Sequence, residues 1–240
     1  LIMDYPNVSI LMPTYNRRKF LPLIIYNLSN MDYDKSKLQW CIYDDGKMPL
    51  FTDETLRETR KILEPIKIFY KYDKKKRDIG VKRNMLVKLC KHNICIMMDD
   101  DDIYFSSYIK HSVETLKNNK VGLVGSNHML FIYPKHNYKM SKIECQAKRQ
   151  IHEATMCFTK KYFNSMNGFK KNSQGEGVGL IDFNDKNVEN IPIDELMVCV
   201  AHKGQTLSKD PFYEYNEHVR PYENREVIKK HYDLLKSLNV

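Results

Sequence analysis

The sequence predicts an α/β fold: a mainly parallel, Rossmann-like sheet flanked by helices, followed by a mixed, partly antiparallel C-terminal half. Two observations support this prediction. Over about the first 105 residues, short apolar runs of strand length alternate with stretches of helical spacing, joined by short loops. Three of those apolar runs end abruptly in polar or acidic residues. Alternation at this spacing is typical of parallel strands joined by right-handed helical crossovers.

The length and composition favour a single domain over residues 1–240. With 240 residues and 42% hydrophobic content, the chain can bury one substantial core. No apolar run approaches the roughly 18 residues of a membrane span, and the first residues lack the order of a signal peptide. We therefore expect a soluble, cytoplasmic protein with no transmembrane segment. The sequence leaves open whether it is part of a longer polypeptide.

The six cysteines indicate no disulfide framework and no zinc site, because they contain neither a Cys-x-x-Cys pair nor zinc-ligand spacing. Four of them, Cys41, Cys95, Cys157 and Cys199, lie in apolar, strand-like runs, where cysteine behaves as a small hydrophobic residue. We expect all six to be reduced.

The expected elements of the first half follow from local patterns. Strands are predicted at 8–12, 38–43, 66–70 and 94–98, and helices at 17–30, 52–63 and 80–90. Thr52 is the expected N-cap of the second helix, and Pro65 lies just beyond its end.

The second half does not continue the alternation of strands and helices. A helix is expected at 105–116, and residues 121–133 form one long strand or a hairpin pair. Isolated strands are expected at 155–158 and 196–201, and a helix at 223–238 closes the chain. Residues 168–185, rich in Gly, Asn, Ser and Asp, are predicted to be a mobile loop of functional length.

The run Asp99 to Asp102, directly after the apolar strand at 94–98, is the strongest functional signal. A like-charge pair about 4 Å apart costs on the order of 4 kcal/mol at an effective dielectric near 20, so four adjacent carboxylates favour a countercharge. Mg²⁺ or Mn²⁺ would supply it, because both prefer carboxylate oxygen. The alternative is a solvated acidic turn that caps the next helix. The position favours a site, since ligands of open α/β sheets bind at the carboxyl ends of strands.

Three predicted strand ends together suit a nucleotide diphosphate. They carry Pro13-Thr14-Tyr15, Asp44-Asp45 and the acidic run. An aromatic ring stacks on a base, a carboxylate accepts from a base N–H or a ribose hydroxyl, and metal-bearing carboxylates hold a diphosphate. Each element alone has an ordinary structural explanation. Their arrangement in order at strand ends indicates a site.

The net charge of +9 suits anionic partners, and two other functions use it. A basic nucleic-acid-binding module would stack bases on Tyr and contact phosphate through Arg, but the acidic run argues against nucleic acid as the partner. A metal-dependent nucleotidyltransferase shares the acids and the nucleotide, but no Gly-rich phosphate loop follows the first strand.

Four segments, taken together, resemble the successive signatures of the GT-A glycosyltransferases of family 2. They are Val8 to Arg17, Tyr43 to Gly46, Gly80 to Asn84, and Met98 to Tyr104. The resemblance covers about the first 105 residues, and beyond them it rests on Asn167-Gly168-Phe169. It implies a GT-A fold and inverting transfer from a nucleotide-diphospho-sugar, UDP-sugar favoured, to a glycan, lipid-linked or protein acceptor.

The resemblance also assigns roles by matched position. Residues 1–105 would be the nucleotide-sugar-binding half, 106–220 the acceptor and metal half, and 221–240 the closing helix. Mn²⁺ or Mg²⁺ would bind Asp101 and Asp99, with His202 as an additional ligand. The donor would contact Pro13, Thr14, Tyr15, Arg17, Asp44, Lys82, Arg83, Asp99 and Asp100.

The general base of such an enzyme removes the proton of the acceptor hydroxyl. Related enzymes commonly use a Glu-Asp pair well after the metal motif. The candidates here are Glu176, in a Gly-rich loop after Asn167-Gly168-Phe169, and the pair Asp194-Glu195. We favour Glu176, because a cap or a strand-entry turn explains Asp194-Glu195 adequately.

Overall fold

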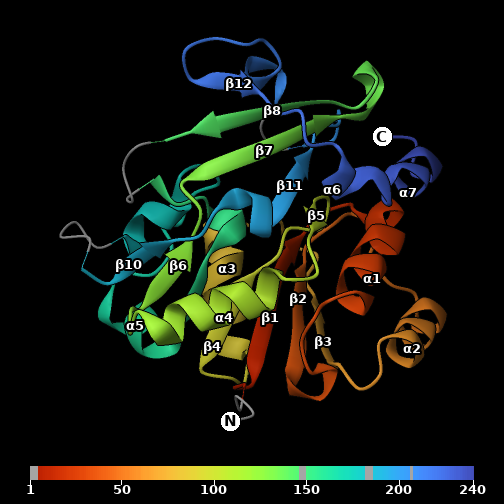
Figure 1. Cartoon of the computed structure of the whole chain (residues 1–240). Coiled ribbons are helices and arrows are strands. Elements are labelled where there is room, and N and C mark those ends of the chain that lie inside the picture. Colours follow the sequence, from red (N-terminus) through yellow and green to blue (C-terminus); the bar gives the residue numbers. More distant parts are fainter. Residues whose placement is uncertain (1–4, 146–149, 182–185, 206–207) are drawn as a thin grey trace.

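The computed structural model describes residues 5–145, 150–181, 186–205 and 208–240. It has the α/β fold predicted from the sequence, with a larger sheet flanked by helices and a smaller sheet above it (Figure 1). None of the described helices is long and apolar enough to cross a membrane.

The larger sheet contains seven strands in the order β10-β6-β9-β4-β1-β2-β3. Its strands are β1 (Val8–Thr14), β2 (Leu38–Asp44), β3 (Lys67–Tyr72), β4 (Ile94–Met97), β6 (Leu123–Gly125), β9 (Cys157–Thr159) and β10 (Val188–Asn190). The block from β4 to β3 is parallel, as is the pair β10 and β6, whereas β9 runs antiparallel to both of its neighbours. The parallel strands predicted for the first half are confirmed.

The helices are α1 (Leu21–Ser29), α2 (Asp53–Ile62), α3 (Ile79–Leu89), α4 (Tyr108–Asn118), α5 (Lys160–Ser165), α6 (Glu226–Lys229) and α7 (Tyr232–Ser237). The predicted cap of α2 is confirmed, because the Thr52 side chain accepts from the Thr55 backbone N–H at 3.1 Å. The Thr55 hydroxyl completes a capping box by accepting from the Thr52 N–H at 2.9 Å.

The two faces of the larger sheet carry separate cores because side chains alternate along each strand. On β1, Ile10 and Met12 pack in one cluster with the buried side of α1 and with α4. Leu11 lies in the other cluster, which includes Leu86 of α3 and Phe163 of α5. Helices on both faces explain why the central strands are mainly apolar rather than alternating.

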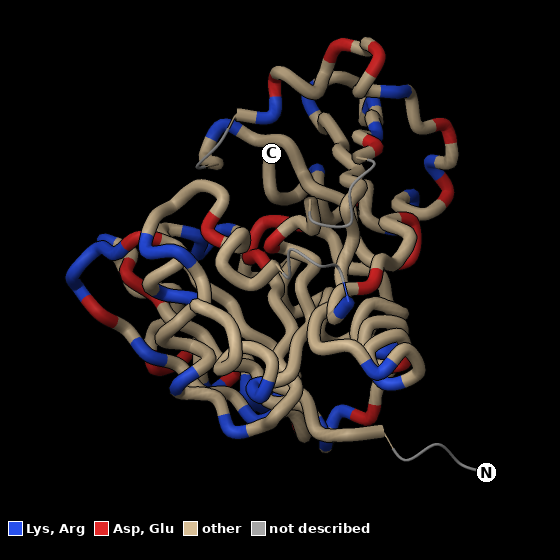
Figure 2. Tube along the Cα trace, turned by 90° about the vertical axis from the view of Figure 1, so that its left-hand side faces the viewer, with Lys and Arg blue, Asp and Glu red and all other residues tan. Residues whose placement is uncertain are grey.

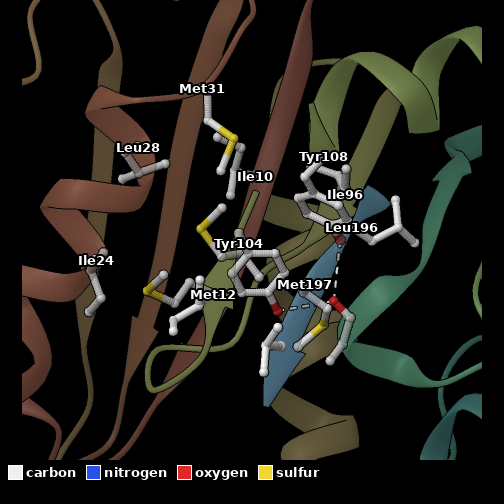
Figure 3. Packing of buried hydrophobic residues seen from close by; sticks show 14 of the residues in the cluster. Ile10, Met12, Ile24, Leu28, Met31, Ile96, Tyr104, Tyr108, Leu196 and Met197 are labelled. Atoms are coloured by element: carbon white, nitrogen blue, oxygen red, sulfur yellow. Dashed lines mark hydrogen bonds between the residues drawn. The ribbon is translucent and has the colours of Figure 1, made fainter. Parts of the chain in front are cut away.

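The smaller sheet has the order β12-β8-β7-β11-β5. Its strands are β5 (Ile103–Tyr104), β7 (His128–Tyr133), β8 (Lys139–Glu144), β11 (Met197–Val200) and β12 (Val219–Pro221). Strand β11 pairs antiparallel with β5, placing Val198 opposite Ile103, and parallel with β7. Figure 3 shows Met197 packed close to Tyr104, which lies opposite it in that ladder.

Two predictions for the second half need correction. Residues 121–133 form neither one strand nor a hairpin: β6 joins the larger sheet and β7 the smaller one. The chain changes sheet at Ser126, whose backbone N–H donates to Thr155 Oγ1 instead of continuing a ladder. The closing helix is divided into α6 and α7, with His231 between them buried and its ring 5.1 Å from that of Tyr26.

The segment at 168–181, predicted to be part of a mobile loop, packs against the start of α3. Gly80 N–H donates to the Asn172 carbonyl at 2.9 Å. A Cβ at Gly80 would lie 1.7 Å from the Lys170 carbonyl oxygen, so only glycine permits this approach. Residues 182–185, the rest of the predicted loop, lie outside the described residues. All six cysteines are free, as expected.

Candidate active site

A cleft of about 710 Å³ opens at the carboxyl ends of β1 and β4. Its walls come from both sheets, from α3 and from a short 3₁₀ helix at Glu176–Leu180 (η6). Most of the predicted site residues line it: Pro13, Thr14, Tyr15, Arg17, Lys82, Arg83, Asp99, Asp100, Asp101 and Glu176. The structure therefore brings together residues that the sequence places up to 163 positions apart.

The four carboxylates of the acidic run have different surroundings. Asp102 turns into the protein, where its Oδ1 accepts from the Val200 backbone N–H at 2.9 Å and its carbonyl oxygen accepts from Asn27. It therefore ties the acidic run to β11 and to α1. All four residues line the cleft, but the Asp102 carboxylate is already held by the Val200 N–H.

Arg17 and His202 supply the positive and polar partners of the acidic run. The Arg17 guanidinium lies 3.3 Å from Asp100 Oδ1 and 3.1 Å from Asp101 Oδ2. His202 Nε2 lies 2.9 Å from the same Asp101 oxygen. Gly204 N–H donates to His202 Nδ1 at 3.1 Å, which assigns the ring proton to Nε2 and makes Nε2 the donor to Asp101.

These partners shift the pKa values of Asp100 and Asp101 in opposite directions. Burial and the neighbouring Asp101 charge raise the pKa of Asp100 well above its usual range. Burial alone would also raise the pKa of Asp101, but the His202 hydrogen bond and the Arg17 charge outweigh it and lower that pKa. Asp101 is therefore the carboxyl held as an anion.

Arg83 joins the acidic run to the far wall of the cleft. Its Nη2 lies 3.1 Å from Asp99 Oδ1 and its Nε lies 3.4 Å from Glu176 Oε1. Only 4% of the Arg83 side chain is exposed, and its Nη1 has no hydrogen-bond partner within the described chain. Burial raises the pKa of Glu176 even though the Arg83 charge opposes this shift.

Lys82 is also buried in the cleft wall. Its Nζ donates to Asp45 Oδ1 at 2.7 Å and to the Thr14 carbonyl at 3.0 Å. Tyr15 lies close by: Lys76 Nζ is 4.6 Å and Lys82 Nζ 6.0 Å from the centre of its ring. An aromatic ring beside two ammonium groups suits a base followed by phosphates.

Asp44, predicted to contact the nucleotide, does not line the cleft. Its Oδ1 accepts from Gly46 N–H at 2.9 Å, and its Oδ2 accepts from Leu50 N–H at 2.6 Å and the Tyr70 hydroxyl at 2.7 Å. The side chain is buried, so in this structure it holds the turn after β2. A contact with the nucleotide remains a prediction.

The alternative bases also lie away from the cleft. Asp194 is 3.5 Å from Lys142 Nζ, and Glu195 is 2.9 Å from His111 Nδ1. About half of the Glu195 side chain is exposed. Of the acids considered for the base, only Glu176 lines the cleft.

Glu153, which the sequence did not single out, also lines the cleft. It begins the short 3₁₀ helix Glu153–Thr155 (η5), and no motif marks this segment. The available signal was its place immediately before the apolar strand β9, which is next to β4 in the larger sheet.

Within the described ranges, no three His, Cys, Asp or Glu side chains converge as a metal site. Two ligands do meet, since Asp101 Oδ2 and His202 Nε2 are 2.9 Å apart. Adjacent ligands of an octahedral ion at about 2.1 Å are separated by about 3 Å, and Mg²⁺ often takes only one or two carboxylates plus phosphate and water. Carboxylate and imidazole also suit Mn²⁺. Asp101 Oδ2 and His202 Nε2 thus offer two ligand atoms for a divalent cation that takes the place of the Nε2 proton. Asp101 is also paired with Arg17, and Asp99 with Arg83.

Comparison with known proteins places these features in a family. The model of the family described as "Glycosyl transferase family 2" matches residues 9–178. That range contains β1, β4, the acidic run, Glu153 and Glu176.

Solved structures share the fold at low sequence identity. The mannosyltransferase PcManGT from Pyrobaculum calidifontis, in complex with GDP-Man and Mn²⁺, is 18% identical with a TM-score of 0.61, over 82% of this chain and 57% of that chain. TarS 1-349 from S. aureus, in complex with UDP-GlcNAc, is 14% identical with a TM-score of 0.62, over 83% and 60%. This chain therefore spans less than two thirds of their length.

Proposed function

The chain belongs to glycosyl transferase family 2, and on this basis we propose that it is an inverting, metal-dependent glycosyltransferase acting as a single domain. The donor is a nucleotide-diphospho-sugar, with a UDP-sugar favoured, and the acceptor is a hydroxyl of a glycan, a lipid-linked molecule or a protein. The acceptor oxygen attacks the anomeric carbon from the face opposite the diphosphate. The bond from that carbon to the phosphate oxygen breaks, and the nucleoside diphosphate leaves.

The observation that carries the proposal is the meeting of Asp101, which lines the cleft, and His202, whose buried Nε2 lies 2.9 Å from Asp101 Oδ2. One ligand follows β4 and the other follows β11, so two distant segments converge on one point. Bound there, Mn²⁺ or Mg²⁺ would stabilise the charge that develops on the leaving diphosphate. Arg17 keeps Asp101 ionised and oriented for this purpose.

The rest of the donor has matching partners along the same wall. Tyr15 offers a ring for stacking by the base, a contact worth about 1–3 kcal/mol. Lys76 and Lys82 supply positive charge beside that ring, and Arg83 supplies it beside Asp99. The base that takes the acceptor proton is a carboxylate of the cleft, for which the sequence predicts Glu176.

The proposal is tested by measuring thermal stability against UDP-, GDP- and CDP-sugars with Mn²⁺, and against oligonucleotides without it. Release of the nucleoside diphosphate is measured in parallel. We expect one nucleotide sugar to stabilise the chain, EDTA to abolish that gain, and the same donor to be consumed. Stabilisation by oligonucleotide alone would instead identify a nucleic-acid-binding module.

A further inference from the structure

Two glutamates face the cleft, and they differ in whether the carboxylate already has a charged partner. Glu176 is paired with Arg83, and only 6% of its side chain is exposed. A proton added to Glu176 would break this buried pair and leave Arg83 with Asp99 alone, a costly change in a buried site. Glu153 is only partly buried and makes no ion pair with any described residue, so it can take a proton without that loss.

The backbone of η6 packs closely against the side chain of Glu153. Gly177 N–H donates to Glu153 Oε1 at 3.0 Å. A Cβ on Gly177 would lie 2.7 Å from Glu153 Cγ and 2.9 Å from Oε1, so the carboxylate fills the space that a side chain at 177 would need. One oxygen is thereby oriented by the backbone, and the other remains for a substrate hydroxyl.

Hydrogen bonds hold the backbone on both sides of Glu153. The next carbonyl, that of Ala154, accepts from the hydroxyls of Tyr104 at 3.0 Å and Tyr108 at 3.2 Å. Thr155 Oγ1 donates to the His152 carbonyl at 2.8 Å and accepts from Ser126 N–H. A catalytic group needs this kind of fixed backbone to hold its geometry.

We infer that Glu153 is the general base of this chain, and that Glu176 is a positioning residue for Arg83. The inference rests on the proposed glycosyl transfer. The attacking oxygen forms its bond to the anomeric carbon and loses its proton to the free oxygen of Glu153. The departing diphosphate keeps the electron pair of the broken bond. Asp99 and Glu176 hold Arg83 between them.

The test compares Glu153→Gln with Glu176→Gln, and uses Glu58→Gln on the exposed face of α2 as a matched control. UDP-GlcNAc and GDP-mannose serve as donor probes with Mn²⁺, and water serves as the acceptor. Release of UDP or GDP gives kcat and KM across pH, and the thermal shift with each donor reports binding. Glutamine keeps the shape and the bond to Gly177, so it removes basicity alone.

We expect Glu153→Gln to lower kcat by roughly 10²–10⁴-fold with donor KM and thermal shift unchanged. It should also remove the fall in kcat on the acidic side of the pH profile. Glu176→Gln should raise donor KM and keep that acidic limb, and Glu58→Gln should match the wild type.

Three outcomes overturn the assignment. Near-normal kcat in Glu153→Gln excludes it as the base. Loss of donor binding in that variant shows a structural role instead. If Glu176→Gln, and not Glu153→Gln, removes the fall in kcat at acidic pH, then Glu176 is the base. If the wild type consumes no donor, the proposed function itself fails, and this inference fails with it.

Discussion

The Tyr104 hydroxyl accepts a hydrogen bond from the Asp99 backbone N–H at 2.8 Å. The same hydroxyl donates to the Ala154 carbonyl at 3.0 Å. One buried oxygen thus connects the first residue of the acidic run to the turn that carries Glu153.

Tyr104→Phe should therefore affect both stability and turnover. Without the hydroxyl, the Asp99 N–H loses its partner, which costs about 1–3 kcal/mol. Tyr108→Phe is the matched control, because its hydroxyl bonds Met97 and Ala154 carbonyls but not Asp99. Urea unfolding should show similar losses for the two variants, while donor consumption should fall more in Tyr104→Phe. Equal turnover in both would show that the Asp99 link is unimportant for catalysis.

Asp101→Ala should abolish donor consumption and the stabilisation by Mn²⁺ while the fold persists. The change removes the anionic partner of His202, but Arg17 keeps Asp100. Differential scanning calorimetry with and without Mn²⁺ and nucleotide sugar measures both effects. Asp233→Ala, at an exposed position of α7, is the control and should behave like the wild type. Retained turnover with Mn²⁺ in Asp101→Ala would refute the metal assignment.

Asp44→Asn should lower stability more than donor affinity. The carboxylate accepts three hydrogen bonds, one at Oδ1 and two at Oδ2. An amide offers only one acceptor oxygen, so at least one buried donor is left unpaired at a cost of about 1–3 kcal/mol. The measurement is the urea midpoint of unfolding together with donor KM. An unchanged midpoint with a raised donor KM would instead support the nucleotide contact predicted from the sequence.

Stability should fall as the pH is lowered from 7 to 5, partly through His231. Burial lowers the pKa of His231 to about 4. The unfolded chain therefore takes up a proton near pH 6.5 while the folded chain does not, and stability present above pH 6.5 is lost as the pH falls toward 4. From the two pKa values, the loss between pH 7 and 5 is about 1–2 kcal/mol.

His231→Phe isolates this contribution because it keeps a ring against Tyr26. His152, with its pKa also lowered to about 4 by burial, adds a similar dependence that this variant leaves in place. The free energy of unfolding, measured by urea titration at several pH values, should depend less steeply on pH in His231→Phe. An unchanged slope would show that His231 contributes nothing to it.

The elements of the first half could be predicted because their signals are local. The cap at Thr52, the apolar runs of β1, β2 and β4 and the helical spacing of α3 each depend on a few neighbouring residues. The acidic run was recognisable for the same reason. Its position at a strand end follows from the parallel topology, which the alternation of strands and helices predicts.

The second half was harder because its structure depends on distant contacts. Strands β6 and β7 are nearly continuous in sequence. The ladder is interrupted between them because the Ser126 N–H donates to the side chain of Thr155, 29 residues later. Glu153 could not be selected because its environment is built by Gly177 and the two tyrosines. The bonds by which Asp44 holds the turn after β2 could not be predicted either, because the fold brings Leu50 and Tyr70 to it.

The pairing of β5 with β11 also sets the order in which the molecule can assemble. Val198 lies opposite Ile103, 95 residues away. Forming this ladder therefore closes a long loop, which costs conformational entropy. Strands β1, β2 and β3 pair in sequence over 28 to 30 residues and can form while later residues are still being synthesised. A nascent chain that ends before β11 would hold the donor-side wall but lack His202. Competence to bind a cation should therefore be one of the last properties that the folding chain acquires.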